Sequence, residues 1–372
     1  MITSVQIGKK LSVKIDDLNH LGNGVSKTVE HGVIWVPFTV TGDLVEIEIE
    51  KKLKSGWIGR LLRVVESSAH RVAPLCSFFG VCGGCQLQHV DYSYQWRAKI
   101  QGLGQAMKRN RIEFDGVIDE FPANEPYQYR SRCQFEFRNG EAGMFGPGSH
   151  SWVSVNRCEI ADEKINEWIF SRSTKHFSGD LSGSIEVRIK DGVVSTVPRE
   201  MADFSQVNLA GNLDLISWMK QHIGEGDQLL DLYGGSGNFA DALGDRFTFR
   251  VCVDNWPCDL KSNTEIQFIH SDVGKWLAQV KSVKLTTMIL DPPRSGLAKV
   301  YNQLSGALER LRLKRVCLVG CDPISWSRDV RFFESQGWKL KNAAVFDFFP
   351  QTKHFETAGI FEPIIDTALK DQ

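Results

Sequence analysis

Residues 228–238, QLLDLYGGSGN, decide the fold because they join a short apolar run to a loop with three glycines. Four further apolar runs follow, separated by stretches long enough for helices: FRVCVDN (249–255), IQFIHSD (266–272), TTMILDPP (286–293) and KRVCLVGC (314–321). Strands that are buried on both faces and alternate with helices are typical of a parallel sheet. Residues 204–372 are therefore expected to form a doubly wound, Rossmann-like α/β domain. Near its end, residues 338–349 and 355–365 are expected to pair as an antiparallel hairpin at the sheet edge.

Two smaller regions precede this domain. Residues 1–67 consist of short β-branched segments separated by glycine-containing turns, which predicts a small β-barrel of the OB type. Residues 68–203 hold a cysteine cluster and two hairpin signals, Asn139-Gly140 and Asp191-Gly192, each of which suits a type I′ turn. This central region is expected to be antiparallel, and its hairpins are candidates for contact with a nucleic acid.

Composition excludes several classes of protein. The 372 residues are 42% hydrophobic and 24% charged, as in ordinary globular proteins of two or three domains. No apolar run approaches the roughly 20 residues that span a bilayer, and the N-terminus lacks a signal peptide. We expect a cytoplasmic protein that does not associate with membranes. Its nine cysteines then indicate metal binding or catalysis rather than disulfides.

The net charge of −1 does not indicate nucleic-acid binding, but one segment stands out. Residues 92–112, YSYQWRAKIQGLGQAMKRNRI, carry five basic and three aromatic side chains and no acidic one. Basic groups contact phosphates and aromatic rings stack on unpaired bases. The segment is therefore either an RNA-binding face or a solvated amphipathic helix.

Polar residues follow the strands of the predicted parallel sheet at the edge where such sheets bind ligands. Gly235 and Gly237 permit close approach of a ligand to the backbone. Asp254 is placed to bind ribose hydroxyls, and Asp272 to receive an adenine amino group. The loop also matches a dinucleotide-binding fingerprint, so a nicotinamide-dependent enzyme is a competing interpretation at this step.

The last two strand ends favour methyl transfer to a pyrimidine carbon. One ends in Asp291-Pro-Pro-Arg294, where enzymes that methylate amines would have an aromatic fourth residue. The other ends in Cys321, which Gly320, Asp322 and Pro323 expose, whereas Cys252 and Cys317 lie within apolar runs and are expected in the core. C5 of uracil becomes nucleophilic only after a thiolate adds to C6, and the thiolate can leave again afterwards.

The reaction also needs a base that removes the proton from C5. Glu356, directly before the last predicted strand, is our choice, and His354 is the alternative.

In these motifs the chain resembles the RNA 5-methyluridine methyltransferase family, in the branch with an N-terminal TRAM domain and an iron–sulfur cluster. The resemblance rests on the order of DFSQVN (203–208), DLYGGSGN (231–238), DPPRSGL (291–297), VGCDPISWSRDV (319–330) and FPQTKHFET (349–357). It implies S-adenosylmethionine as the cofactor, Cys321 as nucleophile and Glu356 as base. The cofactor-binding residues that it implies are Gln206, Tyr233, Gly235, Gly237, Asn238, Asp254, Asp272 and Asp291.

The chain departs from the family pattern at three positions near the expected site. Gly234 stands where the family usually has a cysteine, and Gly320 and Asp322 replace the common serine and asparagine around the nucleophile. An anion at Asp322 would raise the pKa of Cys321 unless a cation such as Arg294 or Arg328 compensates.

A cysteine cluster, Cys76-x5-Cys82-x2-Cys85, indicates a bound metal. Four thiolates hold zinc or iron–sulfur clusters, and spacing alone does not separate the two. The resemblance favours a [4Fe–4S] cluster with Cys158 as the fourth ligand, and Cys133 is the alternative.

The expected partner is RNA, with ribosomal RNA favoured over transfer RNA by the resemblance, and no obligate protein partner is inferred. Two other functions stay open. One is an RNA-binding protein whose transferase domain has weakened, suggested by Gly320 and Asp322. The other is a nicotinamide-dependent oxidoreductase with an iron–sulfur centre.

Overall fold

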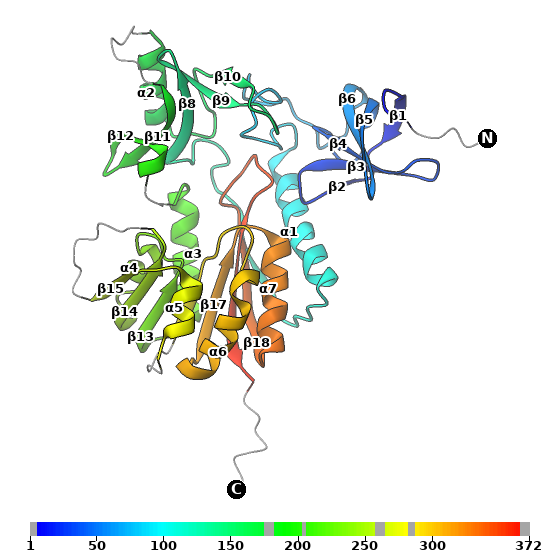
Figure 1. Ribbon diagram of the computed structural model, residues 1–372. Coiled ribbons are helices and arrows are strands. Elements are labelled where there is room, and N and C mark those ends of the chain that lie inside the picture. The colour runs from blue at the N-terminus through cyan, green and yellow to red at the C-terminus, as the bar shows by residue number, and fades with distance from the viewer. Residues whose placement is uncertain (1–5, 175–181, 203–205, 257–264, 282–286, 365–372) are drawn as a thin grey trace. The chain divides into compact units, whose positions relative to one another are not determined.

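The computed structural model describes residues 6–174, 182–202, 206–256, 265–281 and 287–364 (Figure 1). Its contacts divide the chain into two compact units. The first contains the residues up to 102 together with 124–201 and 349–353, and the second contains 103–123 and the rest of the chain. The predicted boundary after residue 67 thus lies inside the first unit. No helix among the described residues is long and apolar enough to cross a membrane.

One sheet of the first unit has six strands in the order β1-β5-β6-β4-β3-β2. Strand β5 shows why it forms: Val45, Ile47 and Ile49 are buried at every second position, and Glu46 and Glu48 between them face solvent and pair with arginines of β6. The strands are β1 (Lys10–Lys14), β2 (Asp17–Leu18), β3 (Asn23–Thr28), β4 (Gly32–Pro37), β5 (Leu44–Leu53) and β6 (Gly56–Glu66).

The other sheet of the first unit has five antiparallel strands in the order β10-β9-β8-β11-β12. Both predicted hairpins are confirmed: Asn139 and Gly140 have φ of 50° and 82°, and Asp191 and Gly192 have φ of 52° and 77°, as type I′ turns require. One face packs on helix α2. The elements are β8 (Arg132–Arg138), β9 (Glu141–Phe145), β10 (Trp152–Ser154), α2 (Glu163–Thr174), β11 (Gly183–Lys190), β12 (Val193–Pro198) and the 3-10 helix η1 (Arg199–Met201).

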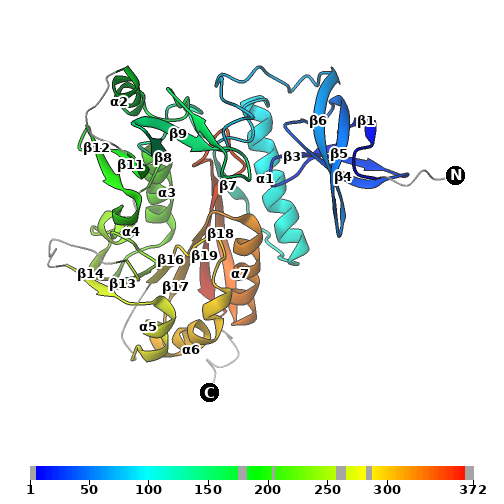
Figure 2. The ribbon, with the colours of Figure 1, turned by 45° about the horizontal axis from the view of Figure 1, so that its top comes forward.

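The second unit is built on an eight-stranded sheet with the order β15-β14-β13-β16-β17-β19-β18-β7, most of which can be followed across Figure 2. Its five consecutive strands β13 to β17 are parallel, as expected. The strands are β7 (Ile118–Phe121), β13 (Gly226–Leu232), β14 (Phe247–Asp254), β15 (Ile266–His270), β16 (Thr287–Leu290), β17 (Arg315–Gly320), β18 (Trp338–Phe346) and β19 (Glu356–Pro363).

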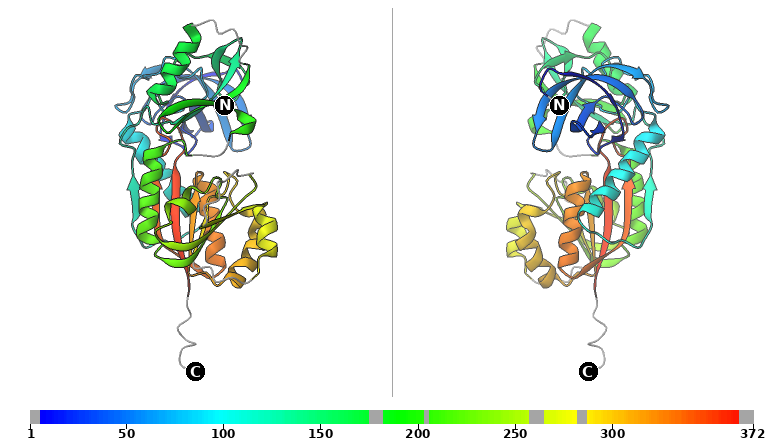
Figure 3. Two further views of the ribbon diagram at one scale, coloured as in Figure 1. Left: turned by 90° about the vertical axis from the view of Figure 1, so that its left-hand side faces the viewer. Right: turned by 90° about the vertical axis from the view of Figure 1, so that its right-hand side faces the viewer.

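Helices cover both faces of this sheet, which explains why β16 is buried at all four positions. Helix α3 lies on one face and α5, α6 and α7 on the other (Figure 3). The helices are α1 (Tyr92–Arg109), α3 (Leu209–His222), α4 (Asn238–Ala242), α5 (Val273–Gln279), η2 (Ala298–Val300), α6 (Tyr301–Leu311) and α7 (Pro323–Ser335), and the boundary between the two units falls within α1.

The C-terminal hairpin forms as expected but does not lie at the edge of the sheet. Strands β18 and β19 pair antiparallel, with β19 inserted next to β17. The edge strand is β7, which pairs parallel with β18 through residues 118–121. The sequence of β7, IDEF, is too short and polar to have been recognised as a strand.

Candidate active site

The carboxyl ends of β13, β14, β16 and β17 lie at one edge of the sheet in the second unit. Leu232 of β13 pairs with Val253 of β14 and with Leu290 of β16, and Leu290 pairs with Leu318 of β17. The order along the sheet reverses at β13, and α/β sheets bind ligands at such a switch point. This edge carries Tyr233, Asp254, Asp291 and Cys321, so the structure brings together the strand-end residues that the sequence singles out.

The loop after β13 has positive φ angles, which glycine adopts readily and other residues rarely adopt. Gly235 and Gly237 have φ of 53° and 85°, and Tyr233 takes a φ of 61°, which a residue with a side chain rarely adopts. Burial, with nearby acidic groups, raises the pKa of the Tyr233 phenol to about 12. At the end of the loop Asn238 exchanges two amide hydrogen bonds, of 2.9 and 3.0 Å, with Asn212 of α3.

Asp254 at the end of β14 connects this loop to the neighbouring strand. Its carboxylate accepts hydrogen bonds from the backbone N–H of Gly235 at 2.9 Å and of Trp256 at 2.7 Å. Each oxygen keeps a lone pair for a ligand hydroxyl. Asp272 is exposed and caps α5 by accepting from the N–H of Lys275 at 2.9 Å. Both acids are therefore held in place before any ligand binds.

Asp231, inside β13, was not among the residues expected in the site. It is fully buried, and burial, assisted by the charges of Asp291 and Asp254, raises its pKa to about 7. One carboxylate oxygen accepts from the N–H of Ala240 at 3.1 Å, and the other is buried without a hydrogen-bond partner among the described residues. A buried, unpaired carboxylate beside two further acids is suited to a cationic ligand. Its position within an apolar run concealed it.

Gln206 is half-buried and lies two residues before Asn208, which begins helix α3. The Asn208 side chain accepts from the N–H of Gly211 at 3.0 Å and donates to the carbonyl of Phe348 at 3.1 Å. The start of α3 is thus held against the end of β18. The first three residues of the DFSQVN motif, 203–205, lie outside the described residues.

Cys321 and Glu356 lie beside each other at the ends of two neighbouring strands. Strands β17 and β19 are antiparallel, with Gly320 opposite Thr357. Cys321, which follows Gly320, therefore faces Glu356, which precedes Thr357. Cys321 is half-buried, and burial together with the charges of Glu356 and Asp291 raises its pKa to about 12, which Arg294 opposes.

Glu356 has the environment of a carboxyl group that favours its protonated form. Burial, and then the charge of Asp291, raise its pKa well above the ordinary value, again against the pull of Arg294. Its Oε2 is buried with no hydrogen-bond partner among the described residues. His354, the alternative base, is half-buried two residues earlier. Cys252 and Cys317, by contrast, are buried in the core as expected.

The predicted metal ligands Cys76, Cys82 and Cys85 lie in the first unit near Cys158. The charge of Cys158 raises the pKa of each of the other three thiols, although burial is the larger cause. Cys133 is buried in the core and its thiol donates a hydrogen bond to Cys158, which lowers the pKa of Cys158. No group of three or more potential ligands in the part of the chain that the structure describes is close enough to hold a metal ion.

Most of the basic and aromatic segment 92–112 forms helix α1, which ends at Arg109. Trp96 is buried, and Lys99 is buried with its Nζ donating to the carbonyl of Phe349 at 3.1 Å. These two side chains therefore serve the core of the first unit and not an RNA-binding face.

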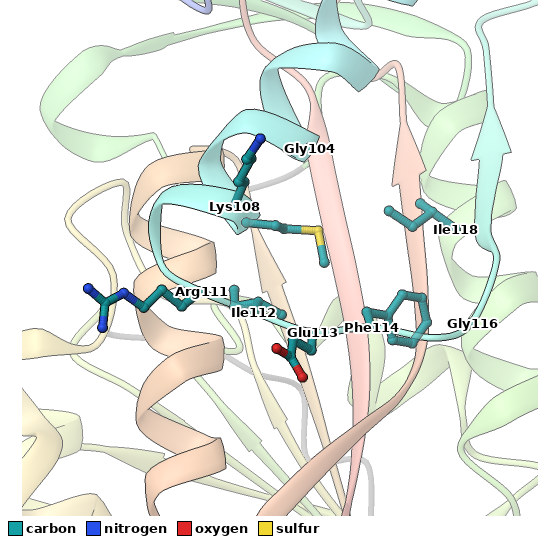
Figure 4. A pocket seen from close by; sticks show the side chains of 9 residues that line it. Gly104, Lys108, Arg111, Ile112, Glu113, Phe114, Gly116 and Ile118 are labelled. Carbon is teal, nitrogen blue, oxygen red and sulfur yellow. The ribbon is translucent and has the colours of Figure 1, made fainter.

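At its other end, α1 borders a shallow hollow of about 410 Å³ within the second unit. Lys108 and Arg111 line it together with apolar side chains such as that of Phe114 (Figure 4). The lining includes none of the residues predicted to bind a cofactor or to catalyse a reaction.

Comparison with known proteins finds similar RNA methyltransferases. The model of the family described as tRNA (Uracil-5-)-methyltransferase matches residues 276–363, which include Cys321 and Glu356. The chain is 24% identical to the 23S rRNA (uracil(1939)-C(5))-methyltransferase RlmD of Shewanella halifaxensis, over 97% of each chain. It is 28% identical to an RNA methyltransferase of Bdellovibrio bacteriovorus, over 94% of each chain. These matches support a relationship of the chain to the RNA uracil-C5 methyltransferase family.

A solved structure supports the fold. The tRNA (uracil-54, C5)-methyltransferase of Pyrococcus abyssi, in complex with S-adenosyl-L-homocysteine, aligns with a TM-score of 0.67 and 20% identity, over 94% of this chain and 99% of that one. The second unit accordingly has the Rossmann-like methyltransferase fold.

Two departures from the family pattern have steric explanations in this chain. A Cβ atom at Gly234 would lie 2.5 Å from the sulfur of Cys252 and 2.9 Å from Asp231, so the side chain of Cys252 occupies the space that a side chain at 234 would need. Similarly, a Cβ at Gly320 would lie 3.2 Å from the ring of Trp326, whose indole donates to the carbonyl of Leu318 at 3.2 Å.

The third departure, Asp322, caps helix α7. Its Oδ1 accepts from the N–H groups of Ile324 at 3.1 Å and Ser325 at 2.8 Å. A carboxylate in this position is stabilised by the helix dipole as well as by the two donors. Asp322 therefore contributes to the helix that follows the nucleophile, and its replacement of asparagine does not indicate a lost activity.

Proposed function

We propose that this protein transfers a methyl group from S-adenosylmethionine to C5 of a uridine in RNA, with Cys321 as the nucleophile and Glu356 as the base. The observation that carries the proposal is the pairing of Cys321 with Glu356 at the ends of β17 and β19, where the carboxylate keeps a buried oxygen without a partner. A half-buried thiol that faces a carboxylate at the ends of two neighbouring strands is the arrangement that the chemistry needs.

The reaction divides into steps that these side chains can perform. The Cys321 thiolate adds to C6 of the uracil ring, which places carbanion character on C5. The bound cofactor supplies the methyl group that this carbon accepts. Glu356 then removes the proton from C5, and the electron pair of that C–H bond re-forms the C5–C6 double bond as the sulfur leaves. Glu356 acts in its ionised form, and because its pKa is raised, this carboxylate is a stronger base than a solvated one.

The thiol must lose its proton, which passes to solvent, before the sulfur attacks. Its raised pKa in the unliganded protein keeps it protonated at neutral pH. Arg294 favours the thiolate, and a cationic cofactor beside Asp291 would reduce the repulsion that this acid exerts. Cys321 should thus become reactive mainly in the complex with cofactor, which limits side reactions of the free protein.

The residues at the strand ends fit S-adenosylmethionine. Asp231 has a buried oxygen without a partner and Asp254 has two oriented oxygens, and these suit a ligand with cationic groups and ribose hydroxyls. Gly235 and Gly237 have positive φ angles and no side chains, so the ligand can approach their backbone closely. The other residues proposed to bind it are Gln206, Tyr233, Asn238, Asp272 and Asp291.

For the substrate we propose ribosomal RNA, because the relative RlmD carries the name of a 23S rRNA enzyme and matches this chain over its length. The structural neighbour acts on tRNA, so tRNA is the alternative. Residues 1–67 are proposed to be a TRAM domain and residues 68–203 an RNA-contacting domain, with catalysis in residues 204–372. An RNA substrate agrees with the cytoplasmic location expected from the sequence.

We also propose a [4Fe–4S] cluster held by Cys76, Cys82, Cys85 and Cys158. These four side chains are thiols, the ligand type that iron–sulfur clusters use, and they interact electrostatically with one another. Arg130 lowers the pKa of three of them, and its positive charge suits a cluster bound by negatively charged thiolates. The cluster would hold this region together without taking part in the chemistry. Iron and sulfide analysis of anaerobically purified protein, with zinc as the competing result, tests this proposal.

Methyl transfer from labelled S-adenosylmethionine to ribosomal and transfer RNA tests the function. Cys321→Ala should bind RNA and cofactor yet transfer no methyl group. Cys317→Ala, which removes a buried thiol from the same strand, is the matched control and should stay active. Normal turnover by Cys321→Ala would refute the role of this thiol.

The same assay separates the other two candidate functions. A wild-type protein that binds S-adenosylmethionine but methylates no RNA would be an RNA-binding protein with a weakened transferase domain. Binding of NADH in place of S-adenosylhomocysteine would instead indicate the oxidoreductase.

A further inference from the structure

The loop between β16 and α6, residues 291–300, carries Asp291 and Arg294 and has little regular structure of its own. Arg294 is exposed, yet its charge acts on both Cys321 and Glu356. The Coulomb effect of a charge depends on its distance from the group that it influences. Arg294 can therefore lower the pKa of Cys321 steadily only if the loop is held in a fixed position relative to this residue.

The loop is fixed by hydrogen bonds from helix α7. The buried carboxylate of Asp329 accepts from the backbone N–H of Leu297 at 2.9 Å and from the hydroxyl of Tyr301 at 2.6 Å. Next to it, Arg328 donates to the carbonyl of Ser295 at 2.6 Å. Three hydrogen bonds thus tie Ser295, Leu297 and Tyr301, at the loop and the start of α6, to helix α7.

The packing around these bonds is tight. Gly296 has a φ of 68°, and a Cβ atom there would lie 2.3 Å from Asp329 Oδ2, so the turn rests directly on the carboxylate. The Tyr301 ring stacks on Phe332 of α7 with 4.1 Å between ring centroids and an interplanar angle of 1°. These contacts leave the loop and the helix little freedom to move relative to each other.

Helix α7 also fixes the nucleophile. It begins directly after Cys321, with Asp322 as its N-terminal cap, and Asp329 lies seven residues beyond that cap, two helical turns along. One helix thus holds the thiol at its end and the arginine-bearing loop on its side. The charged groups that act on Cys321 come from two elements: Glu356 from β19, and Asp291 and Arg294 from the loop that α7 holds, with the effect of Arg294 larger than that of Asp291.

We propose that Asp329, with Tyr301 and Arg328, is a positioning clamp that holds the Asp291–Arg294 loop on α7 and so keeps the Arg294 guanidinium within range of Cys321. In this proposal the clamp residues act on Cys321 through Arg294. This inference rests on the proposed role of Cys321, and it adds residues that the reaction itself does not require.

The test measures how fast iodoacetamide alkylates Cys321 in the full-length protein as a function of pH, with the modified peptide quantified by mass spectrometry. Alkylation reports the thiolate fraction without any methyl transfer. Asp329→Asn and Tyr301→Phe should shift the profile to higher pH, so that alkylation at pH 8 slows at least about threefold. Arg294→Gln should shift it at least as far.

A double-variant cycle separates positioning from simple stabilisation. In the Arg294→Gln background, Tyr301→Phe should have no further effect on the alkylation profile, because the charge that the clamp positions is gone. The matched control is Asp119→Asn, which weakens a 2.8 Å hydrogen bond from the Trp218 indole elsewhere in the same unit and should lower thermal stability without moving the profile.

An unchanged profile in Tyr301→Phe, or equal effects of Tyr301→Phe with and without Arg294, would overturn the clamp. If Asp329→Asn does not fold, the Tyr301→Phe pair decides the question. Failure of the proposed function has a different signature: Cys321→Ala would still methylate RNA, whatever the alkylation profiles show.

Discussion

Replacing Asp231 by asparagine should make the stability of the protein less dependent on pH and should weaken cofactor binding. The carboxyl group is buried in β13, and burial, followed by the charges of Asp291 and Asp254, raises its pKa from 3.8 to about 7. A group with a raised pKa binds its proton more tightly in the folded than in the unfolded state. The folded protein therefore loses stability as the pH rises from about 4 to about 7, and Asp231→Asn removes this loss.

The magnitude follows from the pKa difference. The change from 3.8 to about 7 corresponds to roughly 4 kcal/mol over the whole pH range, since each factor of ten in proton affinity is about 1.4 kcal/mol. About 2 kcal/mol of this falls between pH 5.5 and 8.5. The asparagine N–H₂ would itself lack a partner, which costs about 1–3 kcal/mol at every pH. Because this cost is the same at every pH, the quantity that the pKa of Asp231 predicts is the change with pH of the stability difference between the two proteins.

Thermal midpoints of the full-length wild type and Asp231→Asn, measured from pH 5.5 to 8.5, test this. The difference should shift in favour of the variant by roughly 4–8 °C across that range. Asp245→Asn is the control, because the pKa of this exposed carboxyl is lowered by Lys220 and its contribution does not change above pH 5. Calorimetric titration should show S-adenosylmethionine binding Asp231→Asn about tenfold or more weakly. A pH-independent difference between wild type and variant would refute the reasoning.

Three further changes have defined outcomes. Glu356→Gln should accumulate a covalent protein–RNA adduct on denaturing gels, because proton removal slows by about 10²–10⁴-fold, and free release of product would show that another group such as His354 is the base. Gly234→Ala should destabilise the protein by about 1–3 kcal/mol in chemical denaturation, since its Cβ would lie 2.5 Å from the Cys252 sulfur, and adding Cys252→Ala should restore most of the loss; no rescue would disprove the steric explanation. Asp322→Asn should keep the helix cap and change stability by less than about 0.5 kcal/mol, whereas Asp322→Ala should lose about 1 kcal/mol, and equal losses in both would contradict the capping role.

Local sequence patterns predicted the features that depend on local chemistry. Apolar runs with helical spacers identified the parallel strands β13 to β17, and Asn139-Gly140 and Asp191-Gly192 identified two hairpins, because few other residues adopt a positive φ at both turn positions. The residues after each strand could be located in the same way, since parallel strands bring their carboxyl ends to one edge.

Features that depend on contacts between residues distant in sequence could not be predicted from local patterns. Strand β7 pairs with β18 across more than two hundred residues and has no pattern of its own. Trp96 and Lys99 were expected on either an RNA-binding face or a solvated helix face, but both are buried, which depends on what packs against α1. Asp231 and Asp329 lie within apolar or helical segments, and their importance becomes visible only when their buried oxygens are traced to partners, or to the absence of one among the described residues.

Incubation with S-adenosylmethionine and RNA that carries 5-fluorouridine in place of uridine tests the central claim most directly. Fluorine at C5 cannot be removed as a proton, so the reaction should stop after methyl transfer with the protein still bound to C6. Mass spectrometry of the digested complex should find one methylated fluorouridine attached to Cys321. Attachment to any other residue, or continued methylation of normal RNA by a protein that forms no such complex, would contradict the account.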